Sequence, residues 1–245
     1  MEFLELGLAG LLAGVIDSIA GGGGLITLPA LTLALGAGPH AIGTNKIAGS
    51  IAALVALVVY ARGKYFDVRR SLSFAVWVAV GSFVGSRVSP ILPVSIFQYL
   101  LFITCPLILY VVFKKDLWVK EAHAESRSHF YAVIASGLAC GFYDGVWGPG
   151  GGTFMFLSLL FFVRLPLFTA LAASKLANTL SASTALVSYS EAGFVHYREG
   201  VAVGVGIAIG AYLGATHASK RNADIVRPAL AVVVTLLLVK LAASF

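Results

Sequence analysis

The sequence is poor in charged residues. Lys, Arg, Asp and Glu make up 11% of the 245 residues, whereas 59% are hydrophobic, and the mean hydropathy is +0.93. Soluble globular domains carry about 25% charged residues, which they need to cover a surface that faces water. The shortage of charge excludes a soluble protein. Several apolar runs of about 20 residues predict instead an all-α polytopic membrane protein embedded in the lipid bilayer.

The chain also lacks the usual signatures of enzymes. Its two cysteines, Cys105 and Cys140, lie in apolar segments without metal-binding or redox spacing, so we expect buried structural thiols. The five histidines are scattered, and no nucleophile and base stand out as a catalytic arrangement. No Gly-Lys-Ser/Thr follows the glycine clusters, as it would in a nucleotide-binding loop. These absences predict no metal site, no cofactor and no enzymatic activity.

Two glycine-rich stretches resemble each other. "GVIDSIAGGGG" (14–24) and "GFYDGVWGPGGG" (141–152) each place an aspartate, Asp17 or Asp144, three residues after a glycine and before a glycine cluster. Such flexible, polar sequence is unexpected between apolar segments. Its occurrence at two places indicates an internal repeat.

A second pair of motifs extends the repeat. "AIGTNKIAGS" aligns with "ALAASKLANT", which places Lys46 opposite Lys175, and the offset between the copies stays between 127 and 129 residues. The chain then divides into a first transmembrane repeat (1–113), a polar cytoplasmic linker (114–128) and a second transmembrane repeat (129–245).

Each repeat contains about five apolar segments. They cover 3–20, 25–37, 41–61, 71–88 and 95–113 in the first repeat, and 129–147, 153–163, 167–190, 200–217 and 226–243 in the second. An odd number of segments reverses the orientation of the second copy, so we expect inverted-topology repeats.

The net charge of +6 supports this topology and argues against a nucleic-acid partner. With the loop 62–70 in the cytoplasm, twelve basic residues lie on the cytoplasmic side and three on the other. This distribution follows the positive-inside rule. It predicts a multi-pass protein of the bacterial inner membrane with both termini outside.

The second segment of each repeat is too short to span a bilayer. With 13 residues (25–37) and 11 residues (153–163), these helices would measure roughly 16 to 20 Å, against a hydrocarbon core of about 30 Å. Either they continue past the glycines, or they form a broken or re-entrant hairpin with the preceding segment. Short, glycine-interrupted segments at matching positions indicate a transport site.

The polar residues within the apolar segments suggest an anion site. Lys46 and Lys175 lie five to eight residues inside the third segments, where a charge costs about 2.5–3.5 kcal/mol and is usually paired or functional. Glycines let a ligand approach the backbone, and the N–H groups at the start of the next helix favour an anion. The predicted substrate-binding residues are Gly22, Gly23, Gly24, Asn45, Lys46, Gly150, Gly151, Gly152, Ser174, Lys175 and Asn178.

Structural alternatives stay open at each of these positions. The glycines could serve only close helix packing or a bend, and each lysine could only neutralise an aspartate. Asp17 and Asp144 have three candidate roles: organising the glycine loop, pairing with Lys46 and Lys175, or carrying a coupling proton, because burial favours the protonated carboxyl.

The paired motifs also resemble a known family. "GLLAGVIDSIAGGGGLITLPAL", "GTNKIAGSIAALVALVVYARGKYFD", "GFYDGVWGPGGGTF" and "SKLANTLSASTALVSYSEAGFVHY" are similar to those of the TauE/SafE family, and the similarity covers nearly the whole chain. Its members are known as sulfite exporters or toluene-sulfonate uptake permeases. The resemblance implies an inner-membrane transporter of sulfite, sulfoacetate or related sulfur-containing anions.

Residues and resemblance together predict a secondary transporter that exports such an anion by alternating access, driven by the membrane potential or by proton coupling. The alternatives are an importer of another small organic or sulfur-containing anion and, more remotely, a membrane-embedded sulfur-metabolism enzyme or partner protein. The expected partners are the anion and the bilayer, and a homodimer stays open beside a monomer.

Overall fold

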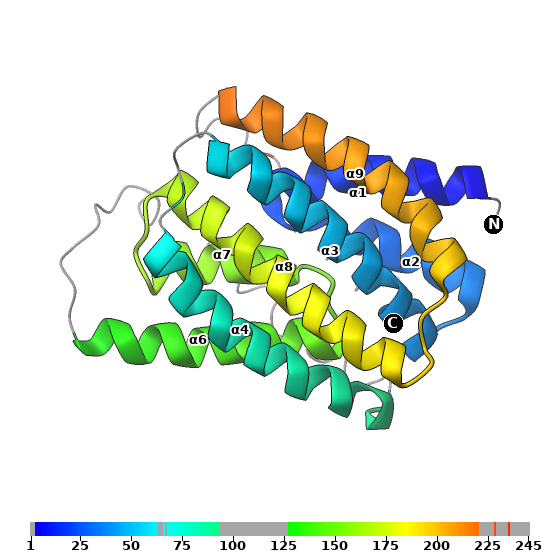
Figure 1. Ribbon diagram of the computed structural model, residues 1–245, viewed down its shortest axis with the longest axis horizontal. Helices are drawn as coiled ribbons and strands as arrows, with labels where there is room; N and C mark the ends of the chain where they lie inside the picture. Colours follow the sequence, from blue (N-terminus) through cyan, green and yellow to red (C-terminus); the bar gives the residue numbers. More distant parts are fainter. Residues whose placement is uncertain are drawn as a thin grey trace.

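A computed structural model describes residues 3–62, 66, 68–93 and 127–220, together with 228 and 235. This part of the chain is helical and contains no strand (Figure 1). Its elements are α1 (Phe3–Ala20), α2 (Gly24–Leu35), α3 (Pro39–Arg62), α4 (Val68–Val88), the short 3-10 helix η1 (Ser89–Ile91), α6 (Arg127–Val146), α7 (Gly151–Phe161), α8 (Leu167–Glu191) and α9 (Tyr197–Lys220).

The predicted segments correspond closely to these helices. The first four of each repeat are present within a few residues of the expected bounds. The predicted fifth segments, 95–113 and 226–243, lie outside the described residues except for 228 and 235. By length and composition, four stretches could cross a membrane: α1, α3, Ser71–Ile91 and α9. Together with the shorter apolar helices, they confirm an all-α, multi-pass membrane protein.

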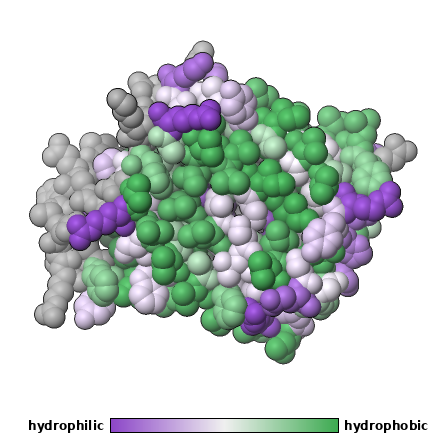
Figure 2. All heavy atoms as spheres, viewed as in Figure 1, coloured by the Kyte–Doolittle hydropathy of each residue, from purple (hydrophilic) through white to green (hydrophobic). Residues whose placement is uncertain are grey.

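The outer surface has the character expected of a membrane protein. The face seen in Figure 2 is largely hydrophobic, and its hydrophilic residues lie mostly toward its edges. Large apolar side chains such as Leu8, Leu12, Val205 and Ile209 are half exposed or more. Their exposure is favourable when the surroundings are lipid rather than water.

The second segments are short helices that begin at the glycine clusters. With 12 and 11 residues, α2 and α7 are about 18 and 16 Å long, too short for the hydrocarbon core. The chain breaks before each of them, with positive φ angles at Gly21 (81°), Gly148 (100°) and Gly150 (76°). Residues other than glycine rarely adopt this conformation. The broken hairpin, rather than a continuous second span, is therefore the structure found.

The third helices of the two repeats run in opposite directions beside each other (Figure 1). At the start of α3, Thr44 Oγ1 accepts a hydrogen bond of 3.0 Å from the backbone N–H of His196, which follows the end of α8. The ring nitrogens of His40 and His196 lie 3.1 Å apart. Equivalent segments of an inverted repeat are expected to be antiparallel in this way.

Each repeat packs its fourth helix against the first helix of the other. In the α1–α9 contact, Gly10 and Gly14 face the α9 backbone, and in the α4–α6 contact, Gly81 and Gly85 face the α6 backbone. A Cβ atom at any of these glycines would collide with a backbone carbonyl oxygen. Small residues at such spacing allow close approach of membrane helices, and here they join the two repeats tightly.

The exchange of the fourth helices creates two packing units. One apolar core is formed mainly by α1, α2, α3 and α9, and the other mainly by α4, α6, α7 and α8. We call these groups of helices the first bundle and the second bundle. Cys140 is buried in the second bundle, as expected, and Cys105 lies outside the described residues.

Candidate functional site

The two glycine breaks meet near the centre of the protein. A Cβ atom at Gly21 would lie 2.5 Å from the backbone nitrogen of Thr153, so only glycine fits there. The hydroxyl of Thr153 donates a hydrogen bond of 2.7 Å to the carbonyl oxygen of Ala20. Segments more than 120 residues apart in sequence, the α1–α2 break and the start of α7, are thereby held in direct contact.

Two buried ion pairs flank this contact. Lys46 Nζ lies 3.3 Å from Asp144 Oδ2, and Lys175 Nζ lies 3.3 Å from Asp17 Oδ2. Each lysine also donates to the backbone carbonyl of its aspartate. The lysines are 3% and 1% exposed and both aspartates 6%. Each pair joins the two repeats and the two bundles, and the four charges sum to zero.

The aspartates have further, different partners. Asp17 Oδ1 accepts a hydrogen bond of 3.1 Å from the backbone N–H of Gly23, so its carboxylate holds the first glycine loop. Asp144 Oδ2 accepts one of 2.6 Å from the hydroxyl of Ser181, whose counterpart in the first repeat is Ala52. These contacts agree with loop organisation at Asp17 and with lysine pairing at both aspartates. Proton coupling stays a prediction.

A small cavity lies between the ion pairs. Its volume is about 30 Å³, enough for about one water molecule. The wall contains three charged residues (Asp17, Lys46 and Asp144) and two amide side chains (Asn45 and Asn178). Its other residues are small: Gly21, Gly24, Gly49, Gly148, Gly152 and Ala182. Asn45 comes from α3 and Asn178 from α8, so the two bundles contribute facing amides.

The amide of Asn178 has no hydrogen-bond partner among the described residues, although its side chain is only 5% exposed. Its Nδ2 lies 3.1 Å from where a Gly152 Cβ would be, which directs the amide toward the cavity wall formed by the α6–α7 break.

Only some of the predicted site residues line this cavity. Gly24, Asn45, Lys46, Gly152 and Asn178 do so. Gly22, Gly23, Gly150 and Gly151 belong to the helix breaks but are absent from the cavity wall. Ser174 donates to the carbonyl of Leu171 in its own helix, and Lys175 is paired with Asp17 away from the wall.

Gly21 and Gly148 belong to the predicted glycine clusters but were not among the predicted substrate-binding residues, and sequence reasoning did not identify Gly49 or Ala182. The repeat alignment carries a signal for Gly49, because it occupies the position equivalent to Asn178. Gly49 therefore leaves space in the first repeat at the position where the second repeat carries the Asn178 amide.

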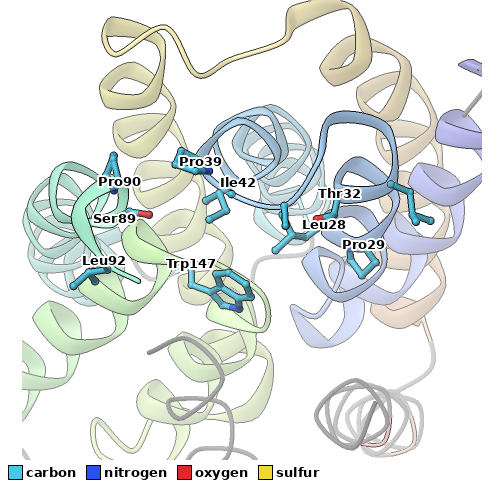
Figure 3. Close-up of a pocket in the computed structure, with 12 residues that line it drawn as sticks. Leu28, Pro29, Thr32, Pro39, Ile42, Ser89, Pro90, Leu92 and Trp147 are labelled. Atoms are coloured by element: carbon cyan, nitrogen blue, oxygen red, sulfur yellow. The ribbon is translucent and has the colours of Figure 1, made fainter. Parts of the chain in front are cut away.

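A larger pocket of about 390 Å³ lies one helical turn from the central cavity (Figure 3). Leu28 follows Gly24 by one turn in α2, Ile42 precedes Lys46 by one turn in α3, and Trp147 adjoins Gly148. Figure 3 shows Ser89, Pro90 and Leu92, at the end of α4 and beyond, on the far side of this pocket. Its lining is mainly apolar.

The corresponding positions of the second repeat are buried as well. Met155 and Phe156 of α7 and Leu171 of α8 are equivalent to Leu28, Pro29 and Ile42, and all three are fully buried at 0% exposure. Within the described residues, no cluster of three or more His, Cys, Asp or Glu side chains could hold a metal ion.

Comparisons with known proteins give matches over nearly the whole chain. Residues 6–241 match the family model "Sulfite exporter TauE/SafE". A probable membrane transporter protein (ORF9) of a Sinorhizobium species is 32% identical over 96% of this chain and 90% of its own length. A probable membrane transporter protein of Haemophilus influenzae is 31% identical over 89% and 86%. The probable membrane transporter protein YfcA of Escherichia coli K12 is 31% identical over 94% and 86%. No solved structure gives a significant match.

Proposed function

The chain belongs to the sulfite exporter TauE/SafE family of membrane transporters, and from this premise we propose that it exports a small sulfur-containing anion. Sulfite, sulfoacetate and related organosulfonates are the substrate class. Transport is of the secondary type and uses alternating access in the bacterial inner membrane.

The observation that carries this proposal is the composition of the central cavity. Asn178 and Asn45 line it from the two bundles, and Lys46 adds a positive charge. The Asp17 and Asp144 carboxylates also line the cavity, but each is paired with a lysine. The cavity also adjoins the N-terminal ends of α2 and α7 at Gly24 and Gly152, where free N–H groups and the helix dipole favour an anion. This set of donors suits an oxyanion.

The anion would bind by exchange of ion-pair partners. The two lysines and two aspartates are neutral together, so an oxyanion enters as an alternative partner of Lys46, in place of the Asp144 carboxylate at 3.3 Å. Ser181 keeps Asp144 hydrogen-bonded when the lysine turns away. Because a cavity of about 30 Å³ holds about one water, the bundles must move apart slightly to admit the substrate.

The moving bodies we propose are the two bundles rather than the two sequence repeats. The α1–α9 and α4–α6 contacts are too close for either pair to separate easily. The Lys46–Asp144 and Lys175–Asp17 pairs cross from one bundle to the other. Substrate exchange at the Lys46 pair would therefore be coupled to rocking of the first bundle against the second.

The pocket next to Trp147 supports an outward-facing state. In the topology that we propose, with the loop 62–70 in the cytoplasm and both termini outside, this pocket lies on the outer side. The central cavity is closed in this state, because its volume is only about 30 Å³. Export of an anion from a negative cytoplasm is favourable by about 2.3 kcal/mol per charge per 100 mV, so uniport is sufficient.

Flux through purified protein tests this function. In liposomes loaded with sulfite, we expect saturable sulfite efflux that an inside-negative potential accelerates. Protein-free liposomes, and liposomes containing heat-unfolded protein, provide the baseline. The proposal is wrong if neither sulfite nor an organosulfonate such as sulfoacetate leaves the liposomes faster than this baseline.

A further inference from the structure

The geometry points to Thr27 as a positioning residue that makes Asn45 present a hydrogen-bond donor, not an acceptor, to the central cavity. Thr27 lies in α2, one turn beyond the first glycine break, and its side chain is buried at 1% exposure. We infer that its hydroxyl orients the Asn45 amide so that the NH₂ group, not the carbonyl oxygen, faces the ligand. The identity of the ligand rests on the proposed function, whereas the orientation of the Asn45 amide does not depend on it.

The orientation follows from the two contacts of the Thr27 hydroxyl. Thr27 Oγ1 lies 2.5 Å from Asn45 Oδ1 and 3.2 Å from the carbonyl oxygen of Gly23. A hydroxyl has one proton to donate, and the shorter contact to Asn45 is the stronger bond. The carbonyl end of the Asn45 amide is therefore occupied by Thr27.

The opposite end of the Asn45 amide is left for the cavity. Asn45 Nδ2 lies 3.5 Å from where a Gly24 Cβ would be, and both residues line the cavity. On the other wall, Asn178 Nδ2 lies near Gly152 in the same way. Two NH₂ groups, one from each bundle, thus border a space of about 30 Å³.

The two carboxylates in the cavity wall both accept hydrogen bonds from the protein. Asp17 receives hydrogen bonds from Gly23 and Lys175, and Asp144 receives them from Ser181 and Lys46. A ligand that offers acceptor oxygens meets the NH₂ groups of Asn45 and Asn178. By holding the Asn45 carbonyl, Thr27 thereby favours a ligand with acceptor oxygens on the α2–α3 side of the cavity.

This arrangement occurs in one repeat only. The position equivalent to Thr27 in the second repeat is Phe154, and the position equivalent to Asn45 is Ser174, whose hydroxyl bonds to its own helix. The orienting contact is therefore a specific feature of the α2–α3 side of the cavity, not a by-product of the repeat.

The test compares Thr27→Val, which keeps the shape but removes the hydroxyl, with Thr27→Ser, which keeps the hydroxyl. The chain contains three asparagines, at positions 45, 178 and 222, so selective ¹⁵N-asparagine labelling gives three side-chain amide signals in lipid nanodiscs. We expect the Asn45 signal to shift in Thr27→Val and to stay near its wild-type position in Thr27→Ser. Thr27→Ala serves as the second hydroxyl-free variant if the valine variant does not fold.

Sulfite transport provides the functional readout. We expect Thr27→Val to raise the KM for sulfite about five- to ten-fold, as for the loss of one oriented hydrogen bond, with kcat little changed, and Thr27→Ser to restore the KM. Equal KM values and amide signals in the valine, serine and wild-type proteins would overturn the inference. If the wild type transports no sulfite, the proposed function fails, while the Asn45 amide signal still decides whether Thr27 orients the amide.

Discussion

Replacing Lys46 with methionine is expected to lower the thermal unfolding midpoint of the purified protein sharply. The substitution leaves the Asp144 carboxylate buried, at 6% exposure, with the Ser181 hydroxyl as its hydrogen-bond partner. Removing one member of a buried ion pair costs about 3–5 kcal/mol, because the other charge remains without compensation. Thermal unfolding in detergent, followed by intrinsic fluorescence or a thiol-reactive dye, measures the change.

The double variant Lys46→Met/Asp144→Asn separates folding from transport. Without a buried charge, this protein should recover most of the lost thermal stability, since replacing both partners of a buried pair is often nearly neutral. Its sulfite flux should remain at the baseline, because the cavity has lost the cation that we propose binds the anion. A double variant that is stable and transports normally would contradict the role of Lys46.

The second ion pair supplies a matched control. Lys175→Met/Asp17→Asn removes the equivalent pair but keeps Lys46, the lysine that lines the cavity; Asp17 also lines the cavity, whereas Lys175 does not. We expect this double variant to fold and to keep measurable sulfite flux, in contrast to the Lys46 variant. Equal loss of flux in both double variants would show that the two pairs act only as bundle-to-bundle links.

Replacing Gly10 with alanine should disrupt the α1–α9 contact and reduce the yield of folded protein. The added methyl group would lie inside van der Waals contact of the Val203 carbonyl oxygen and 3.1 Å from the backbone nitrogen of Ile207. Because the obstacle is backbone, helix α9 has to move as a whole. Overpacking costs about 1–3 kcal/mol, occasionally more, even where side chains can adjust.

Gly7, one turn earlier in α1, is the matched control for this substitution. A Cβ atom there would lie 3.6 Å from the carbonyl oxygen of Ala202, which is an ordinary contact. Gly7→Ala should therefore change the free energy of unfolding by no more than about 0.5 kcal/mol, so its unfolding midpoint should stay close to that of the wild type. Size-exclusion profiles and unfolding midpoints of the two variants check the difference, and similar behaviour of both would contradict the close α1–α9 packing.

Much of the helical architecture was predictable from local sequence. The segment predicted at 41–61 is α3, Pro39–Arg62, and the short segments at 25–37 and 153–163 are α2 and α7. These predictions succeed because apolar length and glycine clusters act locally, on the few residues around them. The internal repeat likewise placed Asp17, Asp144, Lys46 and Lys175 at equivalent positions before any contact was known.

The partners of these residues were not predictable in the same way. That Lys46 pairs with Asp144, in the other repeat, depends on how the two repeats are arranged in space. The glycines of α1 indicated a close helix contact, but not that α9 would make it. Thr27 and Ser181 resemble ordinary helix residues in the sequence. They acquire their roles only because Asn45 and Asp144 lie beside them.

Replacement of Asn178 by aspartate tests most directly that the central cavity binds the transported anion. The substitution keeps the size of the side chain but puts an acidic oxygen in place of the NH₂ donor that faces the cavity. We expect sulfite flux in proteoliposomes to fall more than about 100-fold, since like charges placed together cost several kcal/mol. Asn178→Leu, which only removes the donor, should reduce flux less severely. Wild-type sulfite flux in a folded Asn178→Asp protein would contradict the assignment of this cavity.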